Sequence, residues 1–460
     1  MGIINAVMAP HPPIIIPGVG RGEEKKIQAT TDAYYEAAGF VAESRPDTIV
    51  IISPHSVIYA DWFHISPGAG GRGSFAAFGD ATSISVDYDE EFVRELADLA
   101  RGNSFPAGTE GERSPEIDHG ALVPLYFLGN AYGGAKLPPV VRIGLSGLSL
   151  AEHYRLGMII KEVAETLGRR VSVVASGDLS HYLTRSGPYG YRKEGPQYDR
   201  QIMDIMGKGD FGSLLKMNES FCSAAGECGH RSFTMMAGCF DGVAVRARRL
   251  SYEGPFGVGY GVCIFEPGDP DPGRRYLDAL RPQRPAADEE DPYVRLARLT
   301  VETYVKTGKK ISPPANLPGE MTKNRAGVFV TLHLYGRLRG CIGTTEPTTP
   351  SIAHEIIQNG VSSCSRDPRF MPVREDELPL LEYSVDVLGK PEDISSPYEL
   401  DVKRYGVIVS CGYRRGLLLP DLEGVDTVEE QISIAMKKAG IYPGERDKIR
   451  LQRFEVVRHV

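Results

Sequence analysis

Strand-like and helix-like segments alternate along the first 268 residues, and this alternation constrains the fold more than any other feature. Residues 3–9 and 48–53 are short β-branched runs, and residues 23–44 between them have the composition of a helix. Further strands are predicted at 140–145, 171–175, 243–250 and 259–265, and further helices at 90–99, 150–167, 199–206 and 231–239. Such alternation favours a partly parallel sheet covered by helices. We therefore predict an α/β domain with a central mixed sheet flanked by helices.

A segment rich in Pro, Gly and charge, residues 267–293, interrupts this pattern and has the composition of a linker. We predict a first domain at 1–268, a linker at 269–289 and a second domain at 290–460. In the second domain, short strands are predicted at 327–334 and 385–388, and helices at 292–306, 350–358 and 428–438. These elements predict a compact α+β unit.

Composition excludes several classes of protein. The formal charge of −8 gives no overall attraction to nucleic acid or to anionic membranes. Seven irregularly spaced cysteines without a CxxC pair indicate neither a disulfide framework nor a zinc finger. We find neither a signal peptide nor an apolar run of the roughly 20 residues that a membrane helix needs. We expect a cytoplasmic protein, and homo-oligomerisation is left open.

Four of the ten histidines have an informative position. His11, His55 and His181 each follow a predicted strand, and His119 lies in the string Asp118-His119-Gly120. Open α/β sheets bind ligands beyond the carboxyl ends of their strands, so these histidines are predicted to converge. The alternative is that each is a loop residue that only hydrogen-bonds to the backbone. The remaining histidines lack this setting and are expected to be structural: His64, His153, His230, His333, His354 and His459.

Such a cluster predicts a metal site. Imidazole suits iron, zinc and copper, and two histidines with one carboxylate suit non-haem Fe(II). A carboxylate is available at Glu227, just before the helix predicted at 231–239.

The strings APHPP, SPH, DHG…VPL and SGDLSH occur in this order over residues 1–266. Together they resemble the class III (LigB-like) extradiol dioxygenases and their Memo-type relatives. The resemblance implies that His11, His55 and Glu227 bind Fe(II), in an oxidoreductase acting on a phenolic or catechol-like molecule. It further implies substrate and acid–base roles for His119 and His181, with Asp178 orienting His181.

The third metal ligand has two candidates, because Cys228 is adjacent to Glu227. In Memo-like proteins a cysteine stands where the dioxygenases have the glutamate. A thiolate would suit copper or zinc, whereas a carboxylate would suit Fe(II). We predict Glu227 and keep Cys228 as the alternative, which would make the first domain a Memo-like redox protein. A binding module without turnover is a third interpretation.

The second domain contains the string LRGCIG at residues 338–343, followed by RDPRF at 366–370 and RGLLLP at 415–420. These strings resemble the AMMECR family over residues 290–460. Chains that join a LigB/Memo-like domain to an AMMECR domain resemble the AmmeMemoRadiSam system protein A group, whose name implies a radical SAM partner.

Four residues of this string are candidate site residues. Arg339 offers a planar cation for a small anion or a peptide. Gly340 and Gly343 flank Cys341 and would let a ligand approach the backbone closely. Cys341 is a candidate nucleophile, although no histidine is evidently paired with it. The alternative is a tight, glycine-shaped turn with a buried cysteine.

Overall fold

The computed structural model describes residues 2–103, 105–279, 289–335, 337–422 and 424–460. Contacts divide the chain into two compact units, Met1–Leu280 and Arg281–Val460. This boundary lies inside the segment 269–289 that was predicted as a linker. Part of that segment is nevertheless folded onto the first unit, because the short helix α10 (Tyr276–Ala279) places Tyr276 edge-on against Tyr154.

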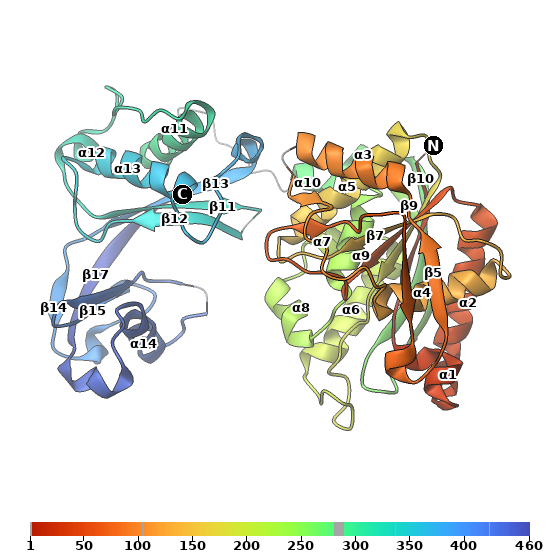
Figure 1. The fold of residues 1–460 in the computed structure, drawn as a ribbon. Coiled ribbons are helices and arrows are strands. Elements are labelled where there is room, and N and C mark those ends of the chain that lie inside the picture. Colours follow the sequence, from red (N-terminus) through yellow and green to blue (C-terminus); the bar gives the residue numbers. More distant parts are fainter. Residues whose placement is uncertain (1, 104, 280–288, 336, 423) are drawn as a thin grey trace. The chain divides into compact units, whose positions relative to one another are not determined.

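Six strands form the central sheet of the first unit, in the order β7-β2-β8-β1-β10-β9 (Figure 1). The parallel strands are β1 (Ile3–Ala9), β2 (Thr48–Ser53), β7 (Val140–Gly144) and β8 (Val171–Ser176). The antiparallel strands are β9 (Val243–Glu253) and β10 (Tyr260–Pro270). Every residue of β2, β7 and β8 is buried, as expected for β-branched strands covered on both faces. The predicted central mixed sheet is confirmed.

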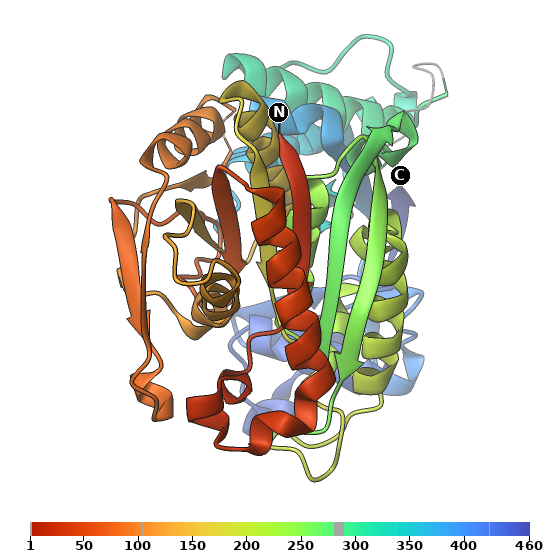
Figure 2. The same ribbon diagram turned by 90° about the vertical axis from the view of Figure 1, so that its right-hand side faces the viewer.

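Helices cover both faces of this sheet. On one face, α2 (Gln28–Ser44) and α4 (His119–Ala131) share a hydrophobic core with alternate residues of β1, β2 and β10. Figure 2 shows α2 running along the strands. The other face is covered by α5 (Leu150–Thr166), α6 (Glu194–Lys208) and α9 (His230–Gly238). The strands β2, β7 and β8 are therefore buried between helices, and the loops that follow their carboxyl ends are the place where a ligand can reach them.

The smaller elements of the first unit connect these layers. The helices are α1 (Pro17–Gly20), α3 (Glu90–Gly102), α7 (Phe211–Leu215) and α8 (Glu219–Ala225), with 3-10 turns at Pro13–Ile15, Glu23–Ile27, Ala76–Phe78 and Pro272–Arg274. The strands are β3 (Phe63–His64) paired with β6 (Ala107–Gly108), and β4 (Gly70–Ser74) paired with β5 (Ser83–Asp87). The β4–β5 hairpin was not predicted, because its Gly- and Ser-rich strands have low β-propensity.

An antiparallel sheet forms the second unit, in the order β12-β11-β13-β17-β15-β16, and β14 pairs with β17. The strands are β11 (Val328–Leu334), β12 (Arg337–Gly343), β13 (Leu381–Leu388), β14 (Glu392–Ile394), β15 (Tyr405–Cys411), β16 (Arg414–Leu418) and β17 (Arg450–His459). The helices are α11 (Pro292–Thr307), α12 (Gly319–Lys323), α13 (Ile352–Ser365) and α14 (Val428–Lys438), with 3-10 turns at Glu375–Leu380, Pro397–Glu399 and Pro443–Lys448. The predicted α+β architecture is confirmed.

The two faces of β11 differ. Val328, Val330 and Leu332 are buried in a core shared with α11 and α13, whereas Phe329, Thr331 and His333 between them are only half-buried. The alternation leaves one face of the sheet available to a ligand.

The LRGCIG string lies in β12, which is an edge strand of this sheet. The alternative of a tight turn is therefore wrong. Its two glycines lower the β-propensity of the segment, which explains why no strand was predicted there. Within the described ranges, no helix combines the length and the apolar character needed to cross a membrane.

Candidate metal centre

Three histidines meet at the carboxyl ends of the parallel strands. His11 follows β1, His55 follows β2, and His119 is the first residue of α4. One ring nitrogen from each lies within 4.8 Å of the others, and Nε2 of His11 is 2.9 Å from Nε2 of His55. They converge because β1 and β2 both pair in parallel with β8, so that their carboxyl ends reach the same edge. The structure thus brings together residues that were 44 and more positions apart in the sequence.

The ring of His11 is oriented by its buried neighbours. Its Nδ1 lies 2.9 Å from the hydroxyl oxygen of Ser176, the last residue of β8. That hydroxyl donates its proton to the carbonyl of Gly120 at 2.5 Å, so it has to accept a hydrogen bond from Nδ1–H of His11. Nε2 is therefore the unprotonated nitrogen, and its lone pair faces the other histidines. Metal-ligating histidines are fixed in the same way.

The start of α4 is held against the end of β2. The carboxylate of Asp118 caps the helix by accepting from the amide of Ala121 at 3.3 Å, and it also accepts from the hydroxyl of Ser53. Gly120 allows this close approach, because a Cβ at that position would collide with the Ser53 oxygen. Ser53, Ser176 and Gly120 were not predicted as site residues. The only available signal was their position beside the predicted histidines.

Cys228, and not Glu227, faces the histidines. The sulfur of Cys228 is 3.6 Å from Nε2 of His11. The carboxylate of Glu227 accepts a hydrogen bond of 2.6 Å from the amide of His230, the first residue of α9, and burial raises its pKa to about 7. The preference for Glu227 as a metal ligand is therefore not supported. Desolvation by burial raises the pKa of the Cys228 thiol well above its ordinary value, so the metal-free cysteine is a neutral thiol.

Asp178 and His181 both line the cavity beside the histidine cluster. The carboxylate of Asp178 accepts a hydrogen bond of 2.8 Å from the backbone amide of His11, and burial raises its pKa to about 7. It therefore positions the His11 loop, and its role in orienting the ring of His181 stays a prediction. The ring of His181 stacks on Tyr189, with 5.2 Å between centroids.

All four predicted histidines are held in the neutral form. Burial lowers the pKa of His119 to about 4, with a further contribution from His55. Burial likewise lowers the pKa values of His11, His55 and His181. Only neutral imidazole has a lone pair for a metal, so these rings are in the state that coordination requires. The donors present therefore fit a metal ion.

A cavity of about 710 Å³ adjoins the cluster. It is lined by the four histidines and by aromatic side chains that include Phe78, Tyr189 and Phe256. Phe78 meets the ring of His119 edge-on, with 5.5 Å between centroids. A planar aromatic molecule is a suitable occupant, because rings stack favourably on aromatic walls.

In the second unit, Arg339 does not offer a free cation. Its guanidinium forms a two-bond ion pair with the buried carboxylate of Glu377, at 2.8 and 3.0 Å, and also donates to the carbonyl of Met371. The prediction that Arg339 receives an anionic ligand is therefore not supported.

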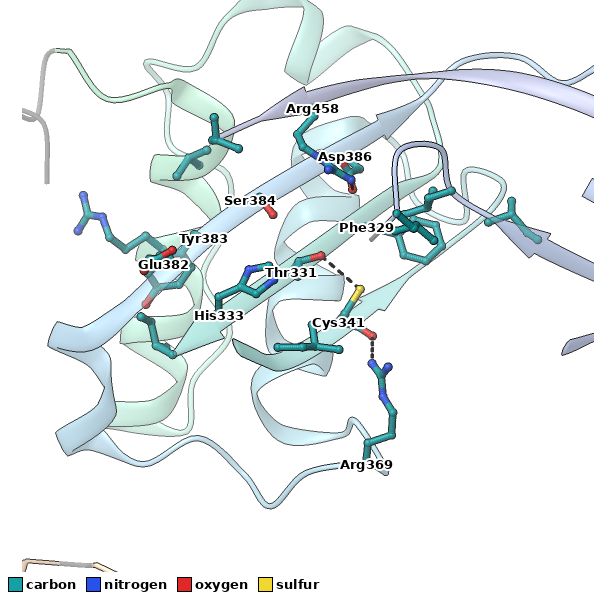
Figure 3. Close-up of a pocket in the computed structure, with 18 of the residues that line it drawn as sticks. Phe329, Thr331, His333, Cys341, Arg369, Glu382, Tyr383, Ser384, Asp386 and Arg458 are labelled. Carbon is teal, nitrogen blue, oxygen red and sulfur yellow. Dashed lines mark hydrogen bonds and ion pairs between the residues drawn. The ribbon is translucent and has the colours of Figure 1, made fainter. Parts of the chain in front are cut away.

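The two glycines of the string serve packing. A Cβ on Gly340 would collide with the carbonyl of Ser363 in α13, and one on Gly343 would collide with the ring of Phe329. Cys341 lines a second pocket, and His333, which was expected to be structural, lines it as well (Figure 3).

Two family models match the chain. The catalytic LigB subunit of aromatic ring-opening dioxygenase matches residues 5–263, and AMMECR1 matches residues 294–459. Protein CA_C1420 of Clostridium acetobutylicum is 39% identical over 471 residues, covering 100% of this chain and 99% of that protein. A protein of Thermotoga maritima is 53% identical over 171 residues, covering 37% of this chain and 98% of its own length.

Two solved structures are also similar. Protein PH0010 of Pyrococcus horikoshii aligns with a TM-score of 0.34 and 37% identity, over 36% of this chain and 88% of that one. Protein JW3007 of Escherichia coli K12 aligns with a TM-score of 0.37 and 15% identity, over 57% of this chain and 99% of that one. The match over residues 5–263 spans the whole candidate metal centre, and the chain therefore belongs to the LigB family, with an AMMECR1-family unit following it.

Proposed function

We propose that the first unit is a metal-dependent oxidoreductase that acts on a phenolic or catechol-like small molecule. The observation that carries this proposal is the convergence of His11, His55 and His119 beside an aromatic-lined cavity. A metal ion held by three neutral imidazoles on one side would keep coordination positions open on the other side, where a substrate could bind. The match to the catalytic subunit of aromatic ring-opening dioxygenase supports the same class of reaction.

His11, His55 and His119 would hold the metal, with the thiol of Cys228 as a further donor. We propose Fe(II) as the resident ion, with copper and zinc as the alternatives, because imidazole suits all three. When bound, such an ion would supply a Lewis acid for the oxygens of the substrate and a path for electrons.

His181 is proposed to accept the phenolic proton. Burial keeps its ring neutral, and a neutral imidazole is a suitable base near pH 7. The ring also stacks on Tyr189 in the wall of the cavity, so it is fixed where a substrate would lie. For His119, its place among the ligand nitrogens favours metal binding over the acid–base role.

Anaerobic purification with metal analysis, followed by an oxygen-uptake assay across catechols, tests this function. We expect bound iron and oxygen uptake, both lost in His11→Ala and His55→Ala. His181→Ala is expected to keep the metal and lose the uptake. A full iron complement without uptake on any catechol would contradict ring cleavage, and unchanged metal content in both ligand variants would contradict the site itself.

A second candidate function is favoured by the position of Cys228. A thiolate suits Cu(I) or zinc, and the first unit would then be a Memo-like redox protein that works with a radical SAM partner. Retention of copper in preference to iron, together with co-purification of a co-expressed radical SAM protein, would support it. A chain that takes up no metal would leave only a binding module.

A further inference from the structure

The second unit contains a pocket of about 840 Å³ that the proposed oxidoreductase does not use (Figure 3). Its floor is the exposed face of β11, β12 and β13. Cys341 is paired across the strands with Thr331, and Thr331 with Ser384. Phe329 is paired with Asp386 in the same way. Because Phe329 and Thr331 are two positions apart on β11, both pairs lie on the same face of the sheet.

The wall of the pocket comes from the far end of the same sheet. Leu417 of β16 and the following Leu419 line the pocket, and they belong to one hydrophobic cluster with Phe329. An ion pair between Glu346, which follows β12, and Arg415 of β16 joins the two ends. The floor and the wall together form an apolar surface beside the Cys341 thiol.

Most cations around this pocket are already neutralised. The ion pairs are Arg298–Glu290 at 2.6 Å, Arg369–Asp367 at 2.7 Å and Arg458–Asp386 at 2.7 Å. Lys438, the last residue of α14, differs, because no ion pair joins it to a carboxylate within the described part of the chain. Its side chain is exposed and lies near Arg369 and the Cys341 thiol, and partial desolvation lowers its pKa.

The carboxylates that line the pocket are Glu290, Glu382 and Asp386, and none of them forms an ion pair with Lys438 within the described residues. Asp386 is engaged with Arg458, and Glu382 is paired across the strands with His333, at the other end of β11 from Phe329. Lys438 and the apolar surface therefore offer a cationic end and a hydrophobic body to the same ligand.

We propose that this pocket binds a small amphipathic carboxylate, with the carboxylate paired to Lys438 and the apolar body against Phe329, Leu417 and Leu419. The volume is within the range of about 300–1,000 Å³ that is typical of small-molecule pockets. Because Lys438 is exposed, its pairing with a carboxylate contributes modestly, and burial of the apolar body against the leucines contributes the rest of the affinity. The Cys341 thiol would lie next to the bound carboxylate.

Equilibrium dialysis of octanoate against the full chain tests the proposal, with octanol as the uncharged control. We expect octanoate to bind more tightly than octanol. Lys438→Gln is expected to weaken octanoate binding about fivefold, as for a partly exposed ion pair. Lys437→Gln is the matched control, since this exposed neighbour on α14 does not line the pocket.

Labelling with iodoacetamide, read by peptide mass spectrometry, locates the bound octanoate. Octanoate is expected to slow the labelling of Cys341 but not that of Cys411, a half-buried cysteine outside the pocket. The proposal is overturned if millimolar octanoate does not bind, if octanol binds equally well, or if Lys438→Gln and Lys437→Gln behave alike. Octanoate binding that leaves the labelling of Cys341 unchanged would place the ligand elsewhere and overturn it too.

Discussion

The sulfur of Cys228 lies 3.6 Å from Nε2 of His11, although 217 positions separate the two residues in the chain. Glu227, the adjacent residue, directs its carboxylate to the first amide of α9 instead. The amide at the start of α9 thus binds the carboxylate of Glu227, and the thiol of Cys228 lies beside the histidines. The donors at the site are imidazole and thiol, which widens the range of metals from iron to copper and zinc.

Replacing Cys228 should therefore change metal affinity, whereas replacing Glu227 should change stability. We expect Cys228→Ser to lower the affinity for copper or zinc by at least about tenfold, because a hard hydroxyl replaces a soft thiolate. Glu227→Ala should leave metal affinity unchanged and cost about 1 kcal/mol of stability through the lost helix-end hydrogen bond. Competition titrations with a chromophoric chelator and urea unfolding measure the two effects. The reverse pattern would assign the ligand to Glu227.

The hydrogen bond from His11 to Ser176 should matter for metal binding more than for folding. Ser176→Ala removes the group that fixes the ring, so we expect metal affinity to fall about 10- to 100-fold. Ser172→Ala is a suitable control, because that buried hydroxyl on the same strand has no hydrogen-bond partner within the described residues. Equal losses in the two variants would show that the strand, and not the hydrogen bond, is responsible.

Metal binding should persist to unusually low pH. The pKa of His119 is lowered to about 4, and those of His11 and His55 are lowered as well, so protons compete with the metal only in more acidic solution. We expect half-release below about pH 5.5 by dialysis and metal analysis, instead of near the ordinary histidine pKa of about 6.5. Release centred at pH 6.5 or above would contradict this environment.

The same lowered pKa values predict how the stability of the metal-free protein depends on pH. Below about pH 6.5 the unfolded chain takes up protons that the folded histidines do not. The contribution of these histidines to stability is therefore fully present above that pH and falls as the solution is acidified toward the folded-state pKa of His119, about 4. The buried carboxyls of Asp178 and Glu227, whose pKa values are raised to about 7, contribute in the opposite direction, so the histidine contribution has to be measured as a difference. Urea unfolding of the parent chain and of His119→Gln at a series of pH values measures this difference, and a parent chain that gains stability relative to His119→Gln on acidification from pH 6.5 to 5 would contradict the predicted sign.

Gly120 should not tolerate a side chain. A methyl group there would collide with the Ser53 hydroxyl, so Gly120→Ala should destabilise the first unit by about 1–3 kcal/mol and weaken metal binding. Gly129→Ala lies in the same helix and meets no atom within 4 Å, so it should be neutral or stabilising by up to about 1 kcal/mol. Thermal unfolding compares the two variants. Equal stability would argue against the close approach of α4 to β2.

Arg339 should affect stability and not ligand binding. Removing the guanidinium in Arg339→Ala leaves the buried carboxylate of Glu377 unpaired, at a cost of about 3 kcal/mol. Arg404→Ala removes an exposed ion pair with Glu455 and should cost less than about 1 kcal/mol. Urea unfolding of the second unit checks the contrast, and a loss of octanoate binding in a still-folded Arg339 variant would contradict the structural role.

Local patterns in the sequence were sufficient for the framework of the fold. The β-branched runs at 3–9 and 48–53 became β1 and β2 at the same residues, because a strand buried on both faces has to be apolar throughout. The rule that ligands bind beyond the carboxyl ends of strands then placed His11 and His55 at one edge before their distance was known. The glycine-containing strands β4 and β12 were missed because their β-propensity is low, although each pairs with the adjacent strand of a hairpin.

The sequence by itself determined the two-part architecture, the central mixed sheet and the identity of the histidines that follow its strands. Only the tertiary structure decided which of two adjacent side chains, Glu227 or Cys228, points at them, and that Glu377 neutralises Arg339. Hydrophobic periodicity fixes the faces of helices and strands but not the direction of a side chain in a loop. That direction depends on hydrogen-bond partners that the fold brings from elsewhere in the chain.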